Sequence, residues 1–208
     1  MSNDQDELDH TLVDVRKAFR LLWLYQRRIL DIVHLITDQF DHEFYCWDAM
    51  GGKPPGRTTT DPTENWVWSM LPFYQLCLLY LPSGAVADQP KRGEWLLEIS
   101  IQSDDGYPTA EENTEPDPMQ FPSPETSGSY LYLRAWYCKK PLKLNWYNQI
   151  WRDNDWPNEE FADLKNLPVA IVRKCVSLTQ MGDKAAVYNA VAEFKGLLKK
   201  HLGLSFSK

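Results

Sequence analysis

The sequence predicts an α+β fold, in which a long N-terminal helix and C-terminal helices pack on a small, mainly antiparallel sheet. Apolar residues recur at helical spacing through the first forty residues, three apolar or alternating runs follow, and a second helical pattern closes the chain. With 208 residues, of which 43% are hydrophobic, the chain is long enough for one substantial core. We therefore expect a single domain over residues 1–208.

The N-terminal helix is expected over residues 6–42. Its stripe alternates spacings of four and three, with Gln26 as the single polar member among Leu8, Leu12, Val15, Phe19, Leu22, Ile29, Val33, Ile36 and Phe40. This stripe predicts either packing along a sheet in a monomer or pairing with a second copy in a homodimer. We favour the sheet, because Leu21, Trp23 and Leu24 place apolar surface outside a narrow dimer seam.

Three strands are expected after a loop at residues 51–62, which contains three glycines and three prolines. Residues 73–81 are apolar on both faces, which predicts a central strand. Residues 94–102 and 129–138 alternate between two faces. The connection at residues 82–93 is short enough to join antiparallel neighbours.

The alternation predicts one apolar face and one wetter face for the second of these strands. Its apolar face contains Trp95, Leu97, Ile99 and Ile101, and its wetter face contains Leu96, Glu98, Ser100 and Gln102. In the third strand, Leu131, Leu133 and Ala135 lie opposite Tyr130, Tyr132, Arg134 and Trp136.

Two helices are expected near the C-terminus, after an irregular, Trp-rich stretch at residues 141–158. The first is predicted from Pro168 to about Gln180. The second is capped by Asp183, ends at Gly203 and has the apolar stripe Val187, Val191, Phe194, Leu198 and Leu202.

The second and third strands are joined by an acidic insert, residues 103–128. It contains seven acids, no base and five prolines, whereas the whole chain has 29 acidic and 22 basic residues and a net charge of −7. The rest of the chain is therefore neutral. Because the insert has little apolar material to bury, we expect it to be disordered.

The cysteines and the longest uncharged stretch indicate the cellular compartment of the protein and whether it spans a membrane. The four cysteines form no CxxC pair, and the first ten residues are polar and acidic, so we expect reduced thiols, no export signal and a cytoplasmic protein. Residues 65–87 carry no charge, but their apolar part, residues 66–81, is shorter than the roughly 20 residues of a membrane span. No membrane span is expected.

The most distinctive segment for binding is residues 130–152, where five bases and no acid are interleaved with aromatic rings. Such a surface suits an acidic protein partner or single-stranded nucleic acid. Alternatively, the rings fill the core beneath a strand and the lysines keep its edge soluble. The candidate binding residues are Arg134, Lys139, Lys140, Lys143, Trp146, Trp151 and Arg152.

Evidence for catalysis or metal binding is sparse. Among common motifs, the sequence has no Gly-rich phosphate loop, no G-x-S-x-G and no H-E-x-x-H, so no cofactor is expected. Acids and histidines recur at helical spacing at Asp31, His34, Asp38 and His42, but nearly opposite the apolar stripe, where a solvated face belongs. We predict no metal site.

Arg27 and Arg28 precede His34 with six and five residues between them. This spacing resembles the catalytic arginine–histidine pattern of HEPN ribonucleases, which implies a ribonuclease with Arg27 and His34 as catalytic groups. That family is all-helical, whereas strands are expected here. An ordinary Arg27–Asp31 pair one helical turn apart is the alternative explanation.

Two functional hypotheses follow. The first is a non-catalytic interaction protein, of the accessory, inhibitor or immunity type, that binds another protein through a Trp- and Tyr-rich surface. The second is a nucleic-acid-binding protein or ribonuclease that uses residues 130–152. The acidic balance and the lack of catalytic motifs favour the first.

Overall fold

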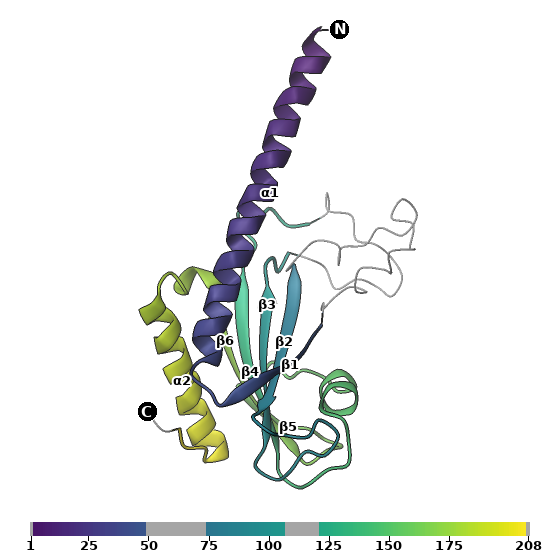
Figure 1. The fold of residues 1–208 in the computed structure, drawn as a ribbon, viewed down its shortest axis with the longest axis vertical. Helices are drawn as coiled ribbons and strands as arrows, with labels where there is room; N and C mark the ends of the chain where they lie inside the picture. The colour runs from purple at the N-terminus through teal and green to yellow at the C-terminus, as the bar shows by residue number, and fades with distance from the viewer. Residues whose placement is uncertain (1, 49–73, 107–120, 207–208) are drawn as a thin grey trace.

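A computed structural model describes residues 2–48, 74–106 and 121–206, with side chains from residue 10 onward (Figure 1). The fold is α+β, as the sequence predicts. Its elements are helix α1 (Ser2–Thr37), strands β1 (His42–Asp48), β2 (Gln75–Pro82), β3 (Trp95–Gln102) and β4 (Tyr130–Cys138), the π-helix η3 (Trp146–Arg152), strands β5 (Phe161–Asp163) and β6 (Val169–Ser177), the 3-10 turn η4 (Leu178–Gln180) and helix α2 (Lys184–Leu202).

The six strands form one sheet in the order β1-β2-β3-β4-β6-β5, and every neighbouring pair is antiparallel. The antiparallel pairing of β2 with β3 across a short connection is confirmed. So is the interior position of β2, which lies between β1 and β3 and is buried along most of its length.

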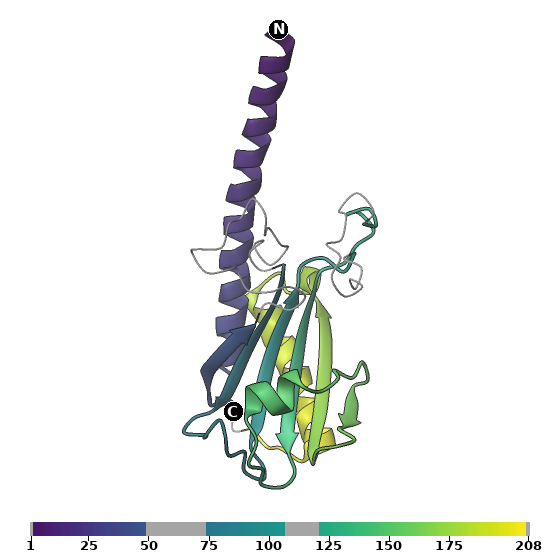
Figure 2. The same ribbon diagram turned by 90° about the vertical axis from the view of Figure 1, so that its right-hand side faces the viewer.

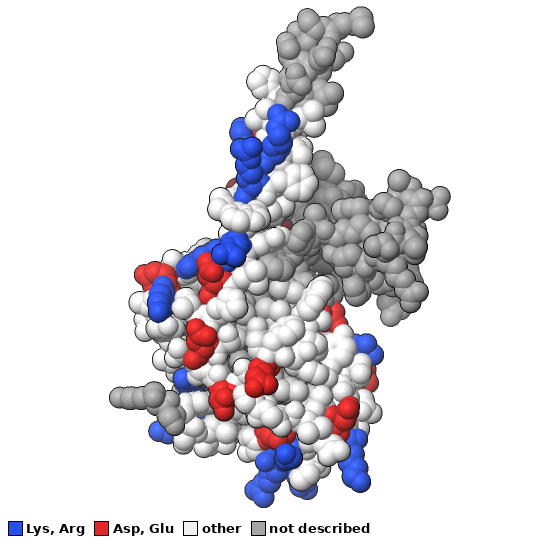
Figure 3. All heavy atoms as spheres, viewed as in Figure 1, with Lys and Arg blue, Asp and Glu red and all other residues white. Residues whose placement is uncertain are grey.

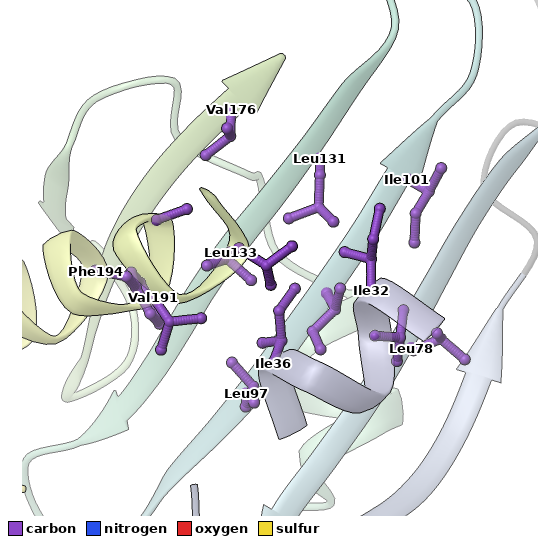
Figure 4. Packing of buried hydrophobic residues seen from close by; sticks show 14 of the residues in the cluster. Ile32, Ile36, Leu78, Leu97, Ile101, Leu131, Leu133, Val176, Val191 and Phe194 are labelled. Atoms are coloured by element: carbon purple, nitrogen blue, oxygen red, sulfur yellow. The ribbon is translucent and has the colours of Figure 1, made fainter. Parts of the chain in front are cut away.

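Each face of the sheet is covered by a different part of the chain. Figures 1 and 2 show the lower part of α1 and all of α2 on one face and η3 on the other. The helix-side core combines Ile99 and Leu133 of the sheet with Val191 and Phe194 of α2. Figure 4 shows Ile32 and Ile36 of α1 packing into the same core. The fold therefore has three layers: α1 with α2, the sheet, and η3.

The predicted N-terminal helix is confirmed as α1. Its apolar stripe is buried in the C-terminal part of the helix and exposed in the N-terminal part. Its C-terminal part packs on the sheet, where Ile29, Ile32, Val33 and Ile36 are buried. Its N-terminal part projects well beyond the sheet (Figure 1). The helix ends at Thr37, earlier than expected, because the chain turns and enters β1 at His42.

The helix predicted over residues 168–180 is wrong. Those residues form β6, which pairs with β4 over its full length, followed by the short turn η4. Val172 and Val176 point to the helix-side core, while Val169 and Ile171 point to the opposite one. This alternation fits a strand buried on both faces, and its β-branched residues favour that state.

Helix α2 matches its prediction at both ends. The Asp183 carboxylate accepts a hydrogen bond from the Ala186 amide at 2.8 Å, which satisfies one free N–H group of the first turn. Gly203 ends the helix in the left-handed conformation, with φ of 69°.

The two ends of the acidic insert are bonded to each other just beyond the ends of β3 and β4. The Asp105 amide donates to the Gly128 carbonyl at 3.0 Å, and the Gly128 amide donates to the Asp105 carboxylate at 2.6 Å. Residues 107–120 of the insert, like the loop expected at 51–62, lie outside the described residues. The expected disorder of the insert stays a prediction.

No helix in the described part of the chain is both long and apolar enough to cross a membrane.

Candidate interaction surface

The sheet face expected to be wetter is a second core. Leu96, Glu98 and Ser100 are all buried there, and Glu98 has no solvent exposure at all. Trp146, Ile150 and Trp151 of η3 pack in this second core. Figure 2 shows η3 lying over this face of the sheet. The wetter face expected for residues 94–102 is therefore wrong, because the Trp-rich segment forms a third layer over it.

Glu98 is at the centre of a buried hydrogen-bond network. Its carboxylate accepts from the Trp136 indole at 2.7 Å and from the Trp151 indole at 2.9 Å. It also forms a salt bridge with Arg134 and accepts from the Ser100 hydroxyl. Four donors surround one carboxylate, so the buried charge is both paired and hydrogen-bonded.

The guanidinium of Arg134 is enclosed by the same layer. Its central carbon lies 5.0 Å from the centre of the Tyr132 ring and 5.8 Å from that of Trp156. The Nε atom is buried and has no hydrogen-bond partner among the described residues. Arg134 is thus held by Glu98 and aromatic rings inside the protein and is absent from the surface on which the sequence analysis places it.

The π-helix η3 buries the two tryptophans singled out as surface anchors. The Asn145 side chain caps η3 by accepting from the Tyr147 and Asn148 amides at 2.9 and 2.8 Å. Trp146 is 0% and Trp151 2% exposed. The expectation that a member of this pair is available to a partner is wrong, and the alternative of rings filling the core holds for both.

The remaining bases of the segment lie outside the core, but acids accompany them. Lys139 pairs with Asp163 at 2.5 Å, and Arg152 lies 4.0 Å from Asp153. Lys140 and Lys143 are exposed, and Lys143 shares a surface hollow with Asp88. The segment is basic in sequence, whereas the surface that it forms is of mixed charge.

The largest apolar exposure lies elsewhere, on the projecting part of α1. Eight of the eleven exposed large hydrophobic residues described are on this one helix: Leu12, Val13, Val15, Phe19, Leu21, Leu22, Trp23 and Leu24. Figure 3 shows blue cations beside them on the projecting helix. The periodicity marked the stripe, but only the placement of the sheet shows which part is uncovered.

The arginine–histidine pattern that resembles a ribonuclease site lies on the exposed face of α1. Arg27 and His34 are both exposed on α1, and the neighbouring Arg28 donates to the Met181 carbonyl at 2.6 Å. No three His, Cys, Asp or Glu side chains within the described ranges gather closely enough to hold a metal ion. His42, expected on the helix, is instead the first residue of β1.

Three of the four thiols are held in the neutral form. Burial raises the pKa of Cys46 to about 11 and also raises that of Cys138. Burial, with the Glu98 carboxylate close by, raises the pKa of Cys77 well above its usual value. A protonated thiol is a poor nucleophile, so these cysteines do not suit nucleophilic catalysis.

A pocket of about 430 Å³ lies between the turn that follows α1, the start of β3 and the C-terminal segment, and His42 and Trp95 line it. Their rings are 4.1 Å apart between centroids, and His42 Nε2 lies 3.1 Å from the Trp95 carbonyl. Burial lowers the pKa of His42, although its contact with that carbonyl and the nearby Asp41 act in the opposite direction. His42 is therefore a neutral packing residue near pH 7.

We expect the protein to lose stability as the pH falls below about 6.5, the ordinary histidine value. The unfolded chain then binds a proton at His42 that the folded chain does not bind, so unfolding becomes more favourable until the lowered folded pKa is passed. Urea unfolding between about pH 7.5 and 5 measures this slope. His42→Gln should flatten it, and His34→Gln is the matched control on the exposed helix face. An unchanged slope in His42→Gln contradicts the assignment.

Comparison with known proteins gives a family without a described activity. The PM0109 family model matches residues 5–203. An uncharacterized protein of Pasteurella multocida (strain Pm70), also named PM0109, is 27% identical over 205 residues, which cover 95% of this chain and 97% of that protein. No solved structure matches the chain. Because the family model spans the projecting helix, the sheet and α2 together, the chain belongs to the PM0109 family.

Proposed function

We propose that this is a non-catalytic protein-interaction protein, of the accessory, inhibitor or immunity type, whose contact element is the projecting part of α1. The observation that carries the proposal is the exposed apolar stripe Leu12, Val15, Phe19 and Leu22, with Trp23 beside it, on a helix that also exposes Val13, Leu21 and Leu24 on its other side. Contiguous apolar surface on a soluble protein is typical of an interaction site. The proposed binding surface is therefore on α1 and no longer on the Trp-rich segment.

The composition of this helix supports a protein partner. Phe19 is 70% and Trp23 61% exposed, and large aromatic side chains contribute strongly when a partner buries them. The helix rests on a rigid base, because its C-terminal part is buried against the sheet. A preorganised helix loses little conformational entropy on binding.

The nucleic-acid hypothesis has less support. Arg134, the central base of residues 130–152, pairs with Glu98 inside the protein. Lys139 pairs with Asp163, which leaves that surface with little excess positive charge.

The proposal also includes a reducing compartment, the cytoplasm, because all four cysteines are free thiols: Cys46, Cys77, Cys138 and Cys175.

Affinity capture from the native host tests the proposal with two matched variants. Phe19 and Leu21 are 70% and 68% exposed, but they lie about 200° apart around the helix. We expect the wild type and Leu21→Ser to capture a protein in stoichiometric amount, and Phe19→Ser to lose it.

The same purified protein is assayed for binding and cleavage of single-stranded RNA. Cleavage that disappears in Arg27→Ala or His34→Ala, or RNA binding without a protein partner sensitive to Phe19→Ser, overturns the proposal.

A further inference from the structure

From the projecting helix we infer the partner: a second copy of this chain, whose α1 packs antiparallel against the first. This inference rests on the proposed function and names the occupant of its contact surface. Its basis is the pattern of apolar and charged residues along one continuous helix, part of which the fold buries and part of which it leaves uncovered.

The apolar stripe continues without a change of spacing from the buried part to the exposed part. Ile29 and Val33 are buried on the sheet, and the same alternation of threes and fours runs back through Leu12, Val15, Phe19 and Leu22, which are all exposed. Such spacing is what two helices need to interlock side chains along a shared seam. The sheet covers only one end of this seam.

The free part is long enough for a stable helix pair. Residues 2–24 are helical and span about 35 Å at 1.5 Å per residue, which is six turns. Trp23 lies next to the seam and widens the apolar surface that a second helix covers.

Charge along the helix selects the direction of the partner. Residues 2–9 contain four acids and no base, whereas residues 16–28 contain five bases and no acid. In a parallel pair, acids lie beside acids and bases beside bases. In an antiparallel pair, each acidic end lies beside the basic stretch of the other copy, so the charges are complementary.

One register satisfies both patterns. With the two-fold axis between residues 13 and 14, Leu12 of each copy lies beside Val15 of the other. Residues 2–9 then lie alongside residues 18–25 of the partner copy, which include Arg20. Arg16 is within one turn of this stretch, as is Lys17, which pairs with Asp14 of its own helix at 2.9 Å. The two sheets lie at opposite ends of the helix pair.

The apolar contact is tested by sedimentation velocity on the full-length protein over a concentration series up to roughly 100 µM, which reaches weak dimers. We expect a reversible dimer for the wild type. Phe19→Ser should weaken it at least roughly a hundredfold, because two phenylalanine contacts are lost per dimer. Leu21→Ser, on the opposite side of the helix, should change it less than about threefold. Circular dichroism confirms that both variants keep their helix.

The direction is tested by charge reversal. Arg16→Glu with Arg20→Glu replaces two of the bases nearest the acidic end of the other copy by acids, which should weaken an antiparallel dimer roughly tenfold. A parallel dimer is unaffected, because base beside base becomes acid beside acid. Adding Asp6→Lys and Asp9→Lys should restore the antiparallel dimer. Added salt should weaken the wild-type dimer, whereas a parallel dimer gains from screening.

A wild-type protein that stays monomeric throughout the series overturns the second-copy inference, and so does equal loss in Phe19→Ser and Leu21→Ser. If a different protein is nevertheless captured in a manner sensitive to Phe19→Ser, the proposed function stands without self-association. Binding of the monomer to anionic lipid vesicles through this helix contradicts both. A dimer that resists the charge reversal overturns the antiparallel arrangement.

Discussion

Glu98→Ala is expected to destabilise the protein by about 3–5 kcal/mol, the cost of leaving one partner of a buried ion pair uncompensated. The substitution leaves the buried Arg134 guanidinium without its ion-pair partner. It also removes the acceptor of the Trp136 and Trp151 indole groups and of the Ser100 hydroxyl, so with Arg134 four buried donors lose this acceptor at once. Urea unfolding measures the loss as a lower midpoint at a constant m-value.

Two variants separate the buried charge from mere loss of a contact. Asp163→Asn removes the exposed partner of Lys139 and should cost no more than about 1 kcal/mol, as surface pairs do. Glu98→Leu combined with Arg134→Met replaces both charges by apolar groups and should recover much of the loss. If Glu98→Ala unfolds at the same urea concentration as Asp163→Asn, the network does not stabilise the fold as described.

Ile29→Asp and Val33→Asp are each expected to unfold the protein. Both side chains are buried between α1 and the sheet, and an unpaired charge there costs several kcal/mol. That cost is comparable with the whole stability of a domain, about 5–15 kcal/mol. Loss of the cooperative thermal transition, followed by circular dichroism, is the measurement.

Phe19→Asp is the matched control, because Phe19 belongs to the same stripe but is exposed. It should leave the thermal transition in place and change only the association state. If Ile29→Asp or Val33→Asp instead stays folded and changes from dimer to monomer, the buried part of the stripe is a dimer seam and the sheet packing is wrong.

Strong local signals made several elements predictable. Helix α2 was predictable at both ends because Asp183 and Gly203 satisfy or terminate the helix through their own local geometry. Strands β3 and β4 were predictable because alternation with period two belongs to the strand itself. In contrast, the sequence predicts a helix where β6 lies, since a short apolar run fits either state until its partner β4 is known.

The candidate site was less predictable, because exposure is a property of neighbours. Trp146 and Trp151 have the composition of a binding surface, yet they are buried over the sheet. Lys139 is part of a basic run in sequence, but Asp163 from another strand is its partner. The stripe of α1 was visible from its spacing, whereas the point at which the sheet stops covering it was not.

Local patterns predict the α+β class, the long N-terminal helix, the capped C-terminal helix and the strands with clear alternation, because these depend on residues within a few positions of one another. The tertiary structure alone decided which side chains are free. Glu98 is buried by Trp151, which is 53 residues away in the chain. Phe19 is exposed because the part of α1 that packs into the helix-side core begins at Tyr25. Burial depends on which distant segments of the chain pack together, and local sequence patterns do not predict that packing.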